Sequence, residues 1–385
     1  MDKIIYLDNN STTQIDPEVL EAMLPYLKER YGNPSSTSHK LGREAFAAVE
    51  IAREQIASLI NADPEEIIFT SGTTESINLA IKGLVENSNA ENINIITSKI
   101  EHKVLHNVCK YLERFGVKVI YLSPDNTGLI SPEDIKSNIS KDIILISIMS
   151  ANNEIGTIQP IGEIGDLCKE RNIFFHTDAA QSVGKIPINL KQLNIDLMSF
   201  SAHKIYGPKG IGALYINKSN KKIDLQPQIH GGGQEKGIRS GTLNVAEIVG
   251  FGKACEICKR KLFEEFNKQI IWRDRIIQNI LNKVEGAFLN GHPYKRIPNN
   301  INIGFKGISN SLFINEFSEL AVSTGSACAS ETLEPSYVLS AIGRTKAEIA
   351  CSVRIGLGRF NTDEEIEYII KRIPEGIKRI KEKIL

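Results

Sequence analysis

A lysine and a cysteine are the two side chains of this sequence whose settings best suit a nucleophile. Lys204 follows His203 and an apolar run, and precedes a glycine-rich turn at 207–212. A lysine in a desolvated site beside a histidine has its charged form disfavoured, so its amine can attack. Cys328 lies among small residues in the segment 322–330, and an exposed cysteine can ionise whereas a buried one is inert. A solvated loop lysine and a cysteine at a helix entry are the plainer alternatives.

Polar residues follow several apolar runs that have the length and composition of buried strands. They are Thr73 and Thr74 after 67–69, His102 after 93–97, Asn153 after 143–149, Asp178 and Gln181 after 174–176, and Ser201 and His203 after 197–200. Ligands bind at the carboxyl ends of strands in an open parallel sheet, so we expect these residues to converge on one rim. Each residue taken alone could equally be an ordinary loop residue, or a helix cap in the case of the two threonines.

Together these residue types fit one cofactor. A Schiff-base lysine, an acid facing a pyridinium nitrogen and a phosphate cup at a helix N-terminus are what pyridoxal 5′-phosphate (PLP) requires. Asp178 would keep the ring nitrogen protonated, and Lys204 would supply the amine. Arg354 lies among apolar residues of a short strand, so we expect it to pair with a carboxylate of the protein or of a ligand.

Other motifs point away from metals and nucleotides. Cys255 and Cys258 form a CxxC pattern inside a long helix, where core packing is expected, and no second pair completes a zinc set. His102 and His106 are four residues apart but lack the glutamate of an HExxH motif. The glycine-dense loop 230–242 matches neither a Walker loop nor a dinucleotide fingerprint. We therefore expect no metal at the site.

Composition excludes several classes of partner. The 385 residues include 46 Lys+Arg and 46 Asp+Glu, giving a formal net charge of zero. A chain without a basic field has no sequence-wide attraction to nucleic acid or to an anionic membrane. The start of the sequence lacks a signal-peptide core, and no apolar run approaches the 18 or so residues that a spanning helix needs. Six scattered cysteines suit a reducing compartment, so we expect a soluble, cytoplasmic protein.

The expected elements alternate between helix and strand from about residue 16 to 250, which indicates a helix-covered, mostly parallel sheet. Strands are predicted at 66–70, 93–97, 118–122, 143–149, 173–177 and 197–201, with helices such as 101–114 and 161–169 between them. One long amphipathic helix is predicted over 248–284. Short strands at 299–305, 320–323 and 352–357, with helices at 309–317 and 363–384, then form a smaller α+β appendage.

Nine segments carry a resemblance to a known family. They are 6–13, 31–36, 70–76, 152–156, 176–181, 199–204, 239–242, 323–330 and 354–360. Over essentially its whole length the chain resembles the cysteine desulfurases, PLP enzymes of the aspartate-aminotransferase fold (fold type I). The resemblance implies an α/β large PLP-binding domain at 16–258. A small α+β domain at 1–15 and 259–385 would carry the catalytic cysteine loop at about 323–337.

The resemblance also implies residue roles. Lys204 would form the Schiff base, His102 would stack on the ring and shuttle protons, Asp178 would pair with the ring nitrogen, and Gln181 with the phenolic oxygen. The phosphate would be held by Thr73, Thr74, Ser201, His203 and, from the other subunit of a homodimer, Thr242. Asn153 and Arg354 would hold the substrate carboxylate. L-cysteine would become L-alanine while Cys328 takes the sulfur as a persulfide.

The resemblance is to the subgroup that serves iron–sulfur assembly, so a sulfur-acceptor or iron–sulfur scaffold protein is an expected partner. Cys328 could transiently contact an iron–sulfur cluster. The chain stops at Leu385 without the C-terminal tail of many scaffold-serving members, which leaves the mode of docking open. Two other functions stay open: another PLP enzyme, such as an aminotransferase or a selenocysteine lyase, and a catalytically silent scaffold or thiol carrier.

Overall fold

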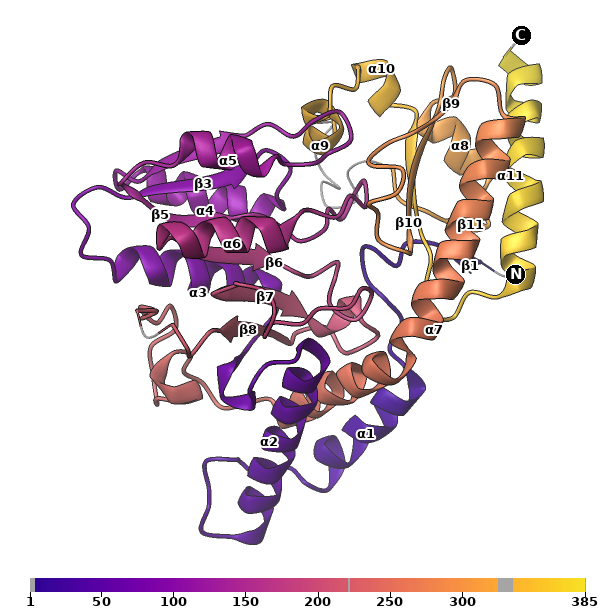
Figure 1. The fold of residues 1–385 in the computed structure, drawn as a ribbon. Helices are drawn as coiled ribbons and strands as arrows, with labels where there is room; N and C mark the ends of the chain where they lie inside the picture. Colours follow the sequence, from indigo (N-terminus) through magenta and orange to yellow (C-terminus); the bar gives the residue numbers. More distant parts are fainter. Residues whose placement is uncertain (1–3, 221, 325–334, 385) are drawn as a thin grey trace.

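A seven-stranded sheet forms the centre of the larger part of the protein (Figure 1). The computed structural model describes residues 4–220, 222–324 and 335–384. The spatial order of the strands is β2-β8-β7-β6-β5-β3-β4. Their bounds are β2 Ile67–Thr70, β3 Asn94–Ser98, β4 Lys118–Leu122, β5 Ile143–Ser147, β6 Phe174–Asp178, β7 Leu197–Ser201 and β8 Gly212–Ile216. Only β8 runs antiparallel to its neighbours β2 and β7, so the sheet is mixed but mostly parallel.

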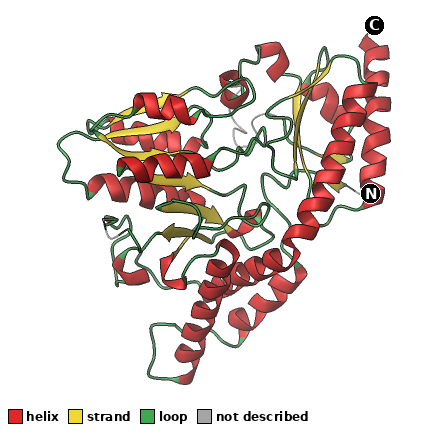
Figure 2. Ribbon diagram, viewed as in Figure 1, coloured by secondary structure: helices red, strands yellow, loops and turns green. Residues whose placement is uncertain are grey.

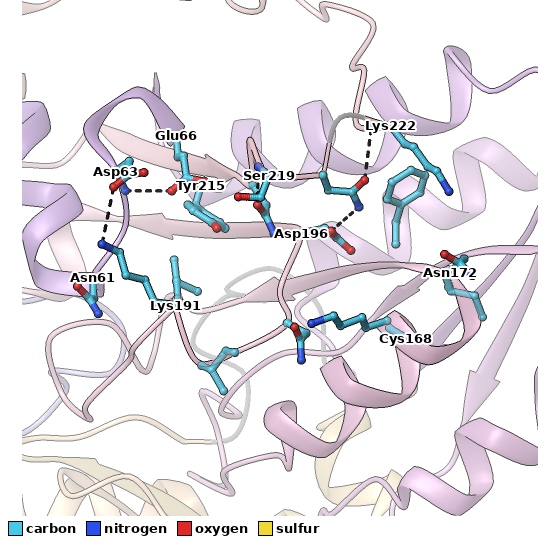
Figure 3. A pocket seen from close by; sticks show the side chains of 18 residues that line it. Asn61, Asp63, Glu66, Cys168, Asn172, Lys191, Asp196, Tyr215, Ser219 and Lys222 are labelled. Carbon is cyan, nitrogen blue, oxygen red and sulfur yellow. Dashed lines mark hydrogen bonds and ion pairs between the residues drawn. The ribbon is translucent and has the colours of Figure 1, made fainter.

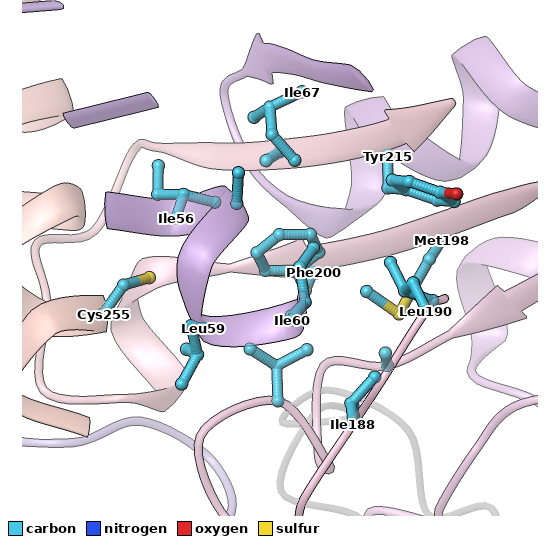
Figure 4. Packing of buried hydrophobic residues seen from close by; sticks show 14 of the residues in the cluster. Ile56, Leu59, Ile60, Ile67, Ile188, Leu190, Met198, Phe200, Tyr215 and Cys255 are labelled. Atoms are coloured by element: carbon cyan, nitrogen blue, oxygen red, sulfur yellow. The ribbon is translucent and has the colours of Figure 1, made fainter. Parts of the chain in front are cut away.

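Helices cover both faces of this sheet (Figure 2). Side chains alternate along a strand, and in β2 Ile67 and Phe69 join one apolar cluster while Ile68 joins another. The first cluster includes residues of α2 (Lys40–Ile60) and of the amino-terminal half of α7 (Val245–Lys283). Figure 4 shows this packing, with Ile56 and Ile60 of α2 beside Phe200. The second cluster includes α3 (Thr73–Glu86) and α4 (Lys103–Glu113).

A separate apolar core lies at the other end of α7. It joins the second half of that helix to α11 (Asp363–Ile384) and to a three-stranded sheet of order β12-β10-β9. These strands are β9 Ala287–Leu289, β10 Asn300–Phe305 and β12 Ser352–Gly356. The chain start contributes to the same core, because β1 (Ile5–Tyr6) pairs in parallel with β11 (Leu320–Ala321). The predicted domain boundary at 258/259 falls inside α7 and stays a prediction.

Short helices complete the described parts of the chain. They are α1 Pro17–Lys28, α5 Pro132–Asn138, α6 Ile161–Arg171, α8 Asn310–Glu316, α9 Tyr337–Ala341 and α10 Lys346–Ile349. α1 begins where the sequence predicts, since Asp16 accepts a hydrogen bond from Glu18 N at 3.0 Å and Pro17 occupies the first helical position. Within the ranges that the structure covers, no helix is long and apolar enough to cross a membrane.

The predicted strands of the large sheet and the long helix are confirmed to within a few residues. β8 was not predicted, because Gly212–Ile216 begins inside the glycine-rich turn at 207–212. α2 begins at Lys40, and its Phe46 is 51% exposed although it is apolar. Cys109, Cys168, Cys255, Cys258 and Cys351 are all buried, as expected for packing residues.

Candidate functional site

A cavity of about 470 Å³ lies at the carboxyl ends of the parallel strands. Nine of the predicted site residues line it: Thr73, Thr74, His102, Asn153, Asp178, Gln181, His203, Lys204 and Arg354. Seven of them follow strands β2, β3, β5, β6 or β7, Asp178 is the last residue of β6, and Arg354 comes from β12 of the smaller core. The expectation that these side chains converge on one rim is therefore met by the geometry, while their individual roles stay predictions.

Lys204 ends a short 3-10 helix, Ala202–Lys204, that directly follows β7. Its Nζ donates to the backbone carbonyls of Asn10 at 2.7 Å and of Ser11 at 2.5 Å. The turn that holds Asn10 and Ser11 belongs to the first dozen residues of the chain, so the amine bridges two segments almost 200 residues apart. This anchoring sets the lysine amine at the wall of the cavity.

Asp178 and His102 supply an acid and an imidazole to the same cavity. Asp178 Oδ1 accepts from Ala180 N at 2.9 Å, and burial raises the pKa of this carboxyl although that bond, His102 and Lys204 oppose the shift. His102 caps α4, with its Nδ1 accepting from Val104 N at 3.2 Å. Because Nδ1 accepts, the neutral ring carries its proton on Nε2. The pair can therefore face a heteroaromatic ring with one acidic and one proton-carrying group.

The N-terminus of α3 forms one wall of the cavity. Gly72 precedes the helix with φ +150°, a conformation that residues with side chains rarely adopt, and no side chain caps the helix there. Uncapped N–H groups and the positive end of the helix dipole favour an anion. Burial, reinforced by Lys204, Lys209 and Lys185, lowers the pKa of His203 to about 4, so this ring is neutral and can donate one hydrogen bond.

Arg354 reaches the cavity from β12 and is hydrogen-bonded to a carboxylate of the protein. Its Nη2 donates to Asp8 Oδ1 at 2.8 Å and to Ser11 Oγ at 2.5 Å, and Nη1 donates to Asn153 O at 3.0 Å. The prediction that Arg354 pairs with a carboxylate is thus confirmed for one supplied by the protein. The partner, Asp8, was not among the predicted site residues.

Unpartnered polar atoms show what chemistry the cavity would accept. Thr73 Oγ1, Asn153 Oδ1 and Arg354 Nε are buried and have no hydrogen-bond partner among the described residues, and all three residues line the cavity. Ser201 Oγ, one residue before the 3-10 helix, is also unpartnered there. Two hydroxyls, one guanidinium N–H and one amide oxygen suit a ligand with anionic groups and a donor. The donor set therefore fits PLP together with an amino-acid carboxylate.

Two predicted residues within the described ranges, Ser201 and Thr242, are not among those that line the cavity. Thr242 is exposed and does not line the cavity. The prediction assigned Thr242 to the phosphate of the other subunit, so a place at the surface agrees with it. Cys328 lies outside the described residues. Three lining residues, Asn10, Ser11 and Thr12, were missed as site residues; they occur in the sequence segment 6–13, but only contact across the fold reveals their place.

A second cavity, of about 560 Å³, lies at the opposite, amino-terminal edge of β6 and β7 (Figure 3). Several of its charged groups have partners within the fold. Lys191 Nζ lies 3.9 Å from Asp63 Oδ1. The carboxylate of Asp196 accepts hydrogen bonds from Asn220 Nδ2 and from Phe175 N. None of its lining residues is among the unpartnered buried atoms, so it lacks the signs of a binding site that the first cavity shows.

Comparison with known proteins places this site in a family. A model of the aminotransferase class-V family matches residues 5–369. The chain belongs to this family. Cysteine desulfurase IscS of Pectobacterium carotovorum subsp. carotovorum is 49% identical to it over 380 residues, covering 98% of this chain and 94% of the relative. Cysteine desulfurase IscS of Rickettsia typhi is 49% identical over 377 residues, covering 98% and 92%.

Solved structures of class-V relatives show the same fold. A NifS-like protein superposes with a TM-score of 0.90 at 39% identity, covering 98% of this chain and 100% of the other. SspA, solved in complex with cysteine, has a TM-score of 0.81 at 39% identity, covering 93% and 99%. The predicted fold class is confirmed, and the chain is a member of the cysteine desulfurases.

Proposed function

We propose that this protein is a PLP-dependent cysteine desulfurase that converts L-cysteine to L-alanine and keeps the sulfur as a persulfide on Cys328. One observation carries the proposal. The amine of Lys204 and the carboxylate of Asp178 enter the same cavity, between the N-terminus of α3 and the guanidinium of Arg354. The family and its cysteine desulfurase members at 49% identity support the same reaction.

PLP would be held by the residues that the cavity gathers. The N-terminus of α3, Thr73, Thr74, Ser201 and His203 would hold the phosphate. Lys204 would bind the aldehyde carbon, and Asp178 and Gln181 would face the ring nitrogen and the phenolic oxygen. When bound, PLP supplies an electron-accepting ring that stabilises negative charge at the substrate α-carbon.

The protein's own groups would bind the substrate and move protons. Arg354 Nε, the guanidinium nitrogen without a partner among the described residues, would donate to the L-cysteine carboxylate, and Asn153 would assist. Lys204 Nζ, already held close to the cavity by two carbonyls, would take the α-proton. His102 Nε2, which carries the ring proton, would exchange protons with the substrate. Such groups accelerate the reaction only where they bind its transition state more tightly than its ground state.

The sulfur step balances without an added oxidant. The thiolate of Cys328 would attack the substrate sulfur, so an S–S bond forms as the S–Cβ bond of L-cysteine breaks. Protonation of Cβ and return of the amino group give L-alanine, and Cys328 is left as a persulfide. An acceptor protein, such as an iron–sulfur scaffold, would then take the terminal sulfur in the cytoplasm.

A homodimer would complete the site. Thr242 is exposed at the end of the glycine-dense loop, where it is able to reach the phosphate held by a second copy. An exposed apolar stripe on α1 supports a covered surface, since Leu20, Leu24 and Leu27 are 43%, 37% and 60% exposed. We extend the proposal to a large domain at 16–258 and a small domain at 1–15 and 259–385.

The test follows alanine and sulfide together during incubation of the purified protein with L-cysteine and PLP. We expect both products in equal amounts when a thiol reductant releases the persulfide. Cys328→Ala should keep the visible absorbance of bound PLP and lose sulfide release, whereas Cys351→Ser, at a buried cysteine, should lose neither. Lys204→Ala should lose the Schiff-base absorbance near 400 nm, and the exposed Lys191→Ala should keep it. Alanine without sulfide, or sulfide from Cys328→Ala, would contradict the proposal.

A further inference from the structure

Lys185 is a buried lysine that the proposed reaction does not use. The residue is 8% exposed and lies on the helical turn that follows β6, four residues after Gln181. Residues four apart on such a turn lie side by side. Burying an ammonium group is costly unless it is hydrogen-bonded, so the partner of this lysine indicates what it is there to do.

The partner is the side chain of Gln181. Lys185 Nζ donates to Gln181 Oε1 at 3.0 Å, and Asn10 Nδ2 donates to the same oxygen at 3.1 Å. Gln181 Nε2 in turn donates to the carbonyl of Asn10 at 2.9 Å. That carbonyl also accepts from Lys204 Nζ at 2.7 Å. A continuous hydrogen-bond chain therefore runs from Lys185 through Gln181 and Asn10 to the amine of Lys204.

Hydrogen-bond polarity fixes the orientation of the Gln181 amide. A glutamine amide can rotate to exchange its oxygen and nitrogen, but an ammonium group can only donate. Lys185 therefore holds Oε1 toward itself. Gln181 Nε2 has two hydrogens, of which Asn10 accepts one, and Gln181 lines the cavity. The second hydrogen is the one available to a ligand in that cavity.

The surroundings of Lys185 are mainly cationic. Burial, together with Lys204 and Arg354, lowers the pKa of Lys185 to about 7, while Cys258 of α7 opposes the shift. Tyr206 and Glu265 line the same narrow void as Lys185. Below this pKa Lys185 is protonated and adds positive potential beside the Lys204 amine, which favours the anionic form of an acidic group in the cavity.

We propose that Lys185 is a positioning residue that locks the Gln181 amide with its nitrogen toward the cavity, so that Gln181 donates to the ionised phenolic oxygen of PLP. The inference rests on the proposed PLP site and adds to it the group that sets the polarity of one contact. Without Lys185, only the two hydrogen bonds with Asn10 hold the Gln181 amide in this orientation. An amide that turns its oxygen toward the phenolic oxygen sets two acceptors against each other.

The experiment measures PLP binding and the pH titration of the visible absorbance in the full-length protein. Lys185→Met keeps the length of the side chain and removes the donor, and the exposed Lys191→Met is the matched control. We expect Lys185→Met to bind PLP about tenfold more weakly, as for loss of one hydrogen bond. The titration midpoint should rise, because the phenolic oxygen loses a donor and the site loses a positive charge. Lys191→Met should match the wild type in both measurements.

A double-mutant cycle with Gln181→Leu separates positioning from a general structural role. If Lys185 acts through Gln181, Lys185→Met should add little to the loss of PLP affinity caused by Gln181→Leu. Additive losses, or an unchanged midpoint in Lys185→Met, would overturn the inference. Should Lys185→Met fail to fold by circular dichroism, Lys185→Leu, which also lacks a donor, takes its place with the same expected shifts. Wild-type protein that binds no PLP would refute the proposed function instead.

Discussion

Removal of the Glu235 carboxylate should destabilise the protein more than any ordinary surface change, because a buried arginine, Arg53, loses its buried carboxylate partner. Glu235 belongs to the glycine-dense loop, and its side chain is 2% exposed. Its two oxygens accept from Arg53 Nη2 at 2.8 Å and from Arg53 Nη1 at 2.9 Å, and Oε2 also accepts from Phe69 N at 2.8 Å. The loop is thereby fastened to α2 and to the strand that leads into α3.

The expected magnitude follows from what Glu235→Ala leaves behind. Arg53 is 7% exposed and would keep Ile67 O, at 2.7 Å, as its buried acceptor, and the more exposed Glu50 Oε1, at 3.1 Å, as its remaining carboxylate partner. Breaking one partner of a buried ion pair costs about 3–5 kcal/mol, a large share of a typical folding free energy of about 5–15 kcal/mol. Replacing both charges, as in Arg53→Met/Glu235→Leu, should recover most of that loss, because no uncompensated charge remains.

The assay is urea denaturation at fixed protein and PLP concentrations, since bound ligand shifts apparent stability. The matched control is Glu44→Ala, which breaks the exposed pair with Lys40 on the same helix, at 3.6 Å. It should cost below about 0.5 kcal/mol. A loss under about 1 kcal/mol for Glu235→Ala, or a double variant as unstable as the single one, would refute the reasoning.

Three further predictions concern pH, packing and substrate binding. Burial raises the pKa of the Glu154 carboxyl from 4.5 to about 7, so the folded state favours the protonated carboxyl. The folding free energy that this preference contributes is fully present below pH 4.5 and is lost as the pH rises through 7. Glu154→Gln should remove roughly 3 kcal/mol of this pH dependence at about 1.4 kcal/mol per unit; parallel stability curves between pH 5 and pH 8 would contradict it. In Gly212→Ala the added Cβ would meet Gly72 Cα at 2.6 Å, displacing the start of α3. PLP affinity should fall about 10–100-fold in a spectroscopic titration, and unchanged affinity would be the opposing result. Arg354→Lys loses the planar fork that binds a carboxylate, so KM for L-cysteine should rise about tenfold or more. Steady-state kinetics that show a lower kcat at unchanged KM would argue against substrate binding by Arg354.

Local sequence signals were sufficient for much of the large domain. Apolar runs such as Lys118–Leu122 and Leu197–Ser201 have the length of buried strands, and both are strands with these bounds. Polar residues directly after each strand could be placed on one rim, since parallel strands share the direction of their ends. Asp178, His102 and Lys204 line one cavity for that reason.

Pairings between distant segments could not be predicted. β8 depends on hydrogen bonds to β2, which lies about 145 residues earlier in the chain, and Ile68 of β2 pairs with Leu214 of β8. The five residues of β8 carry no sign of an antiparallel partner. The contact of Lys185 with Gln181 is local, but the charges of Lys204 and Arg354 that help lower its pKa come from remote elements. Nothing in the neighbourhood of Asp8 in the sequence indicates that Arg354 pairs with it.

The parallel pairing of β1 with β11 has a consequence for biosynthesis. Ile5 pairs with Leu320, Asp8 with Arg354, and Asn10 O with the Lys204 amine. The residues of β1 are therefore synthesised roughly 315 residues before their strand partner exists, which takes roughly 15–60 s at the usual speed of synthesis. The segment 5–8 stays without its final partners during that time, while the large sheet can already assemble. The smaller core and the cavity wall that includes Arg354 close last, so a nascent chain that is cut short lacks the proposed carboxylate-binding group.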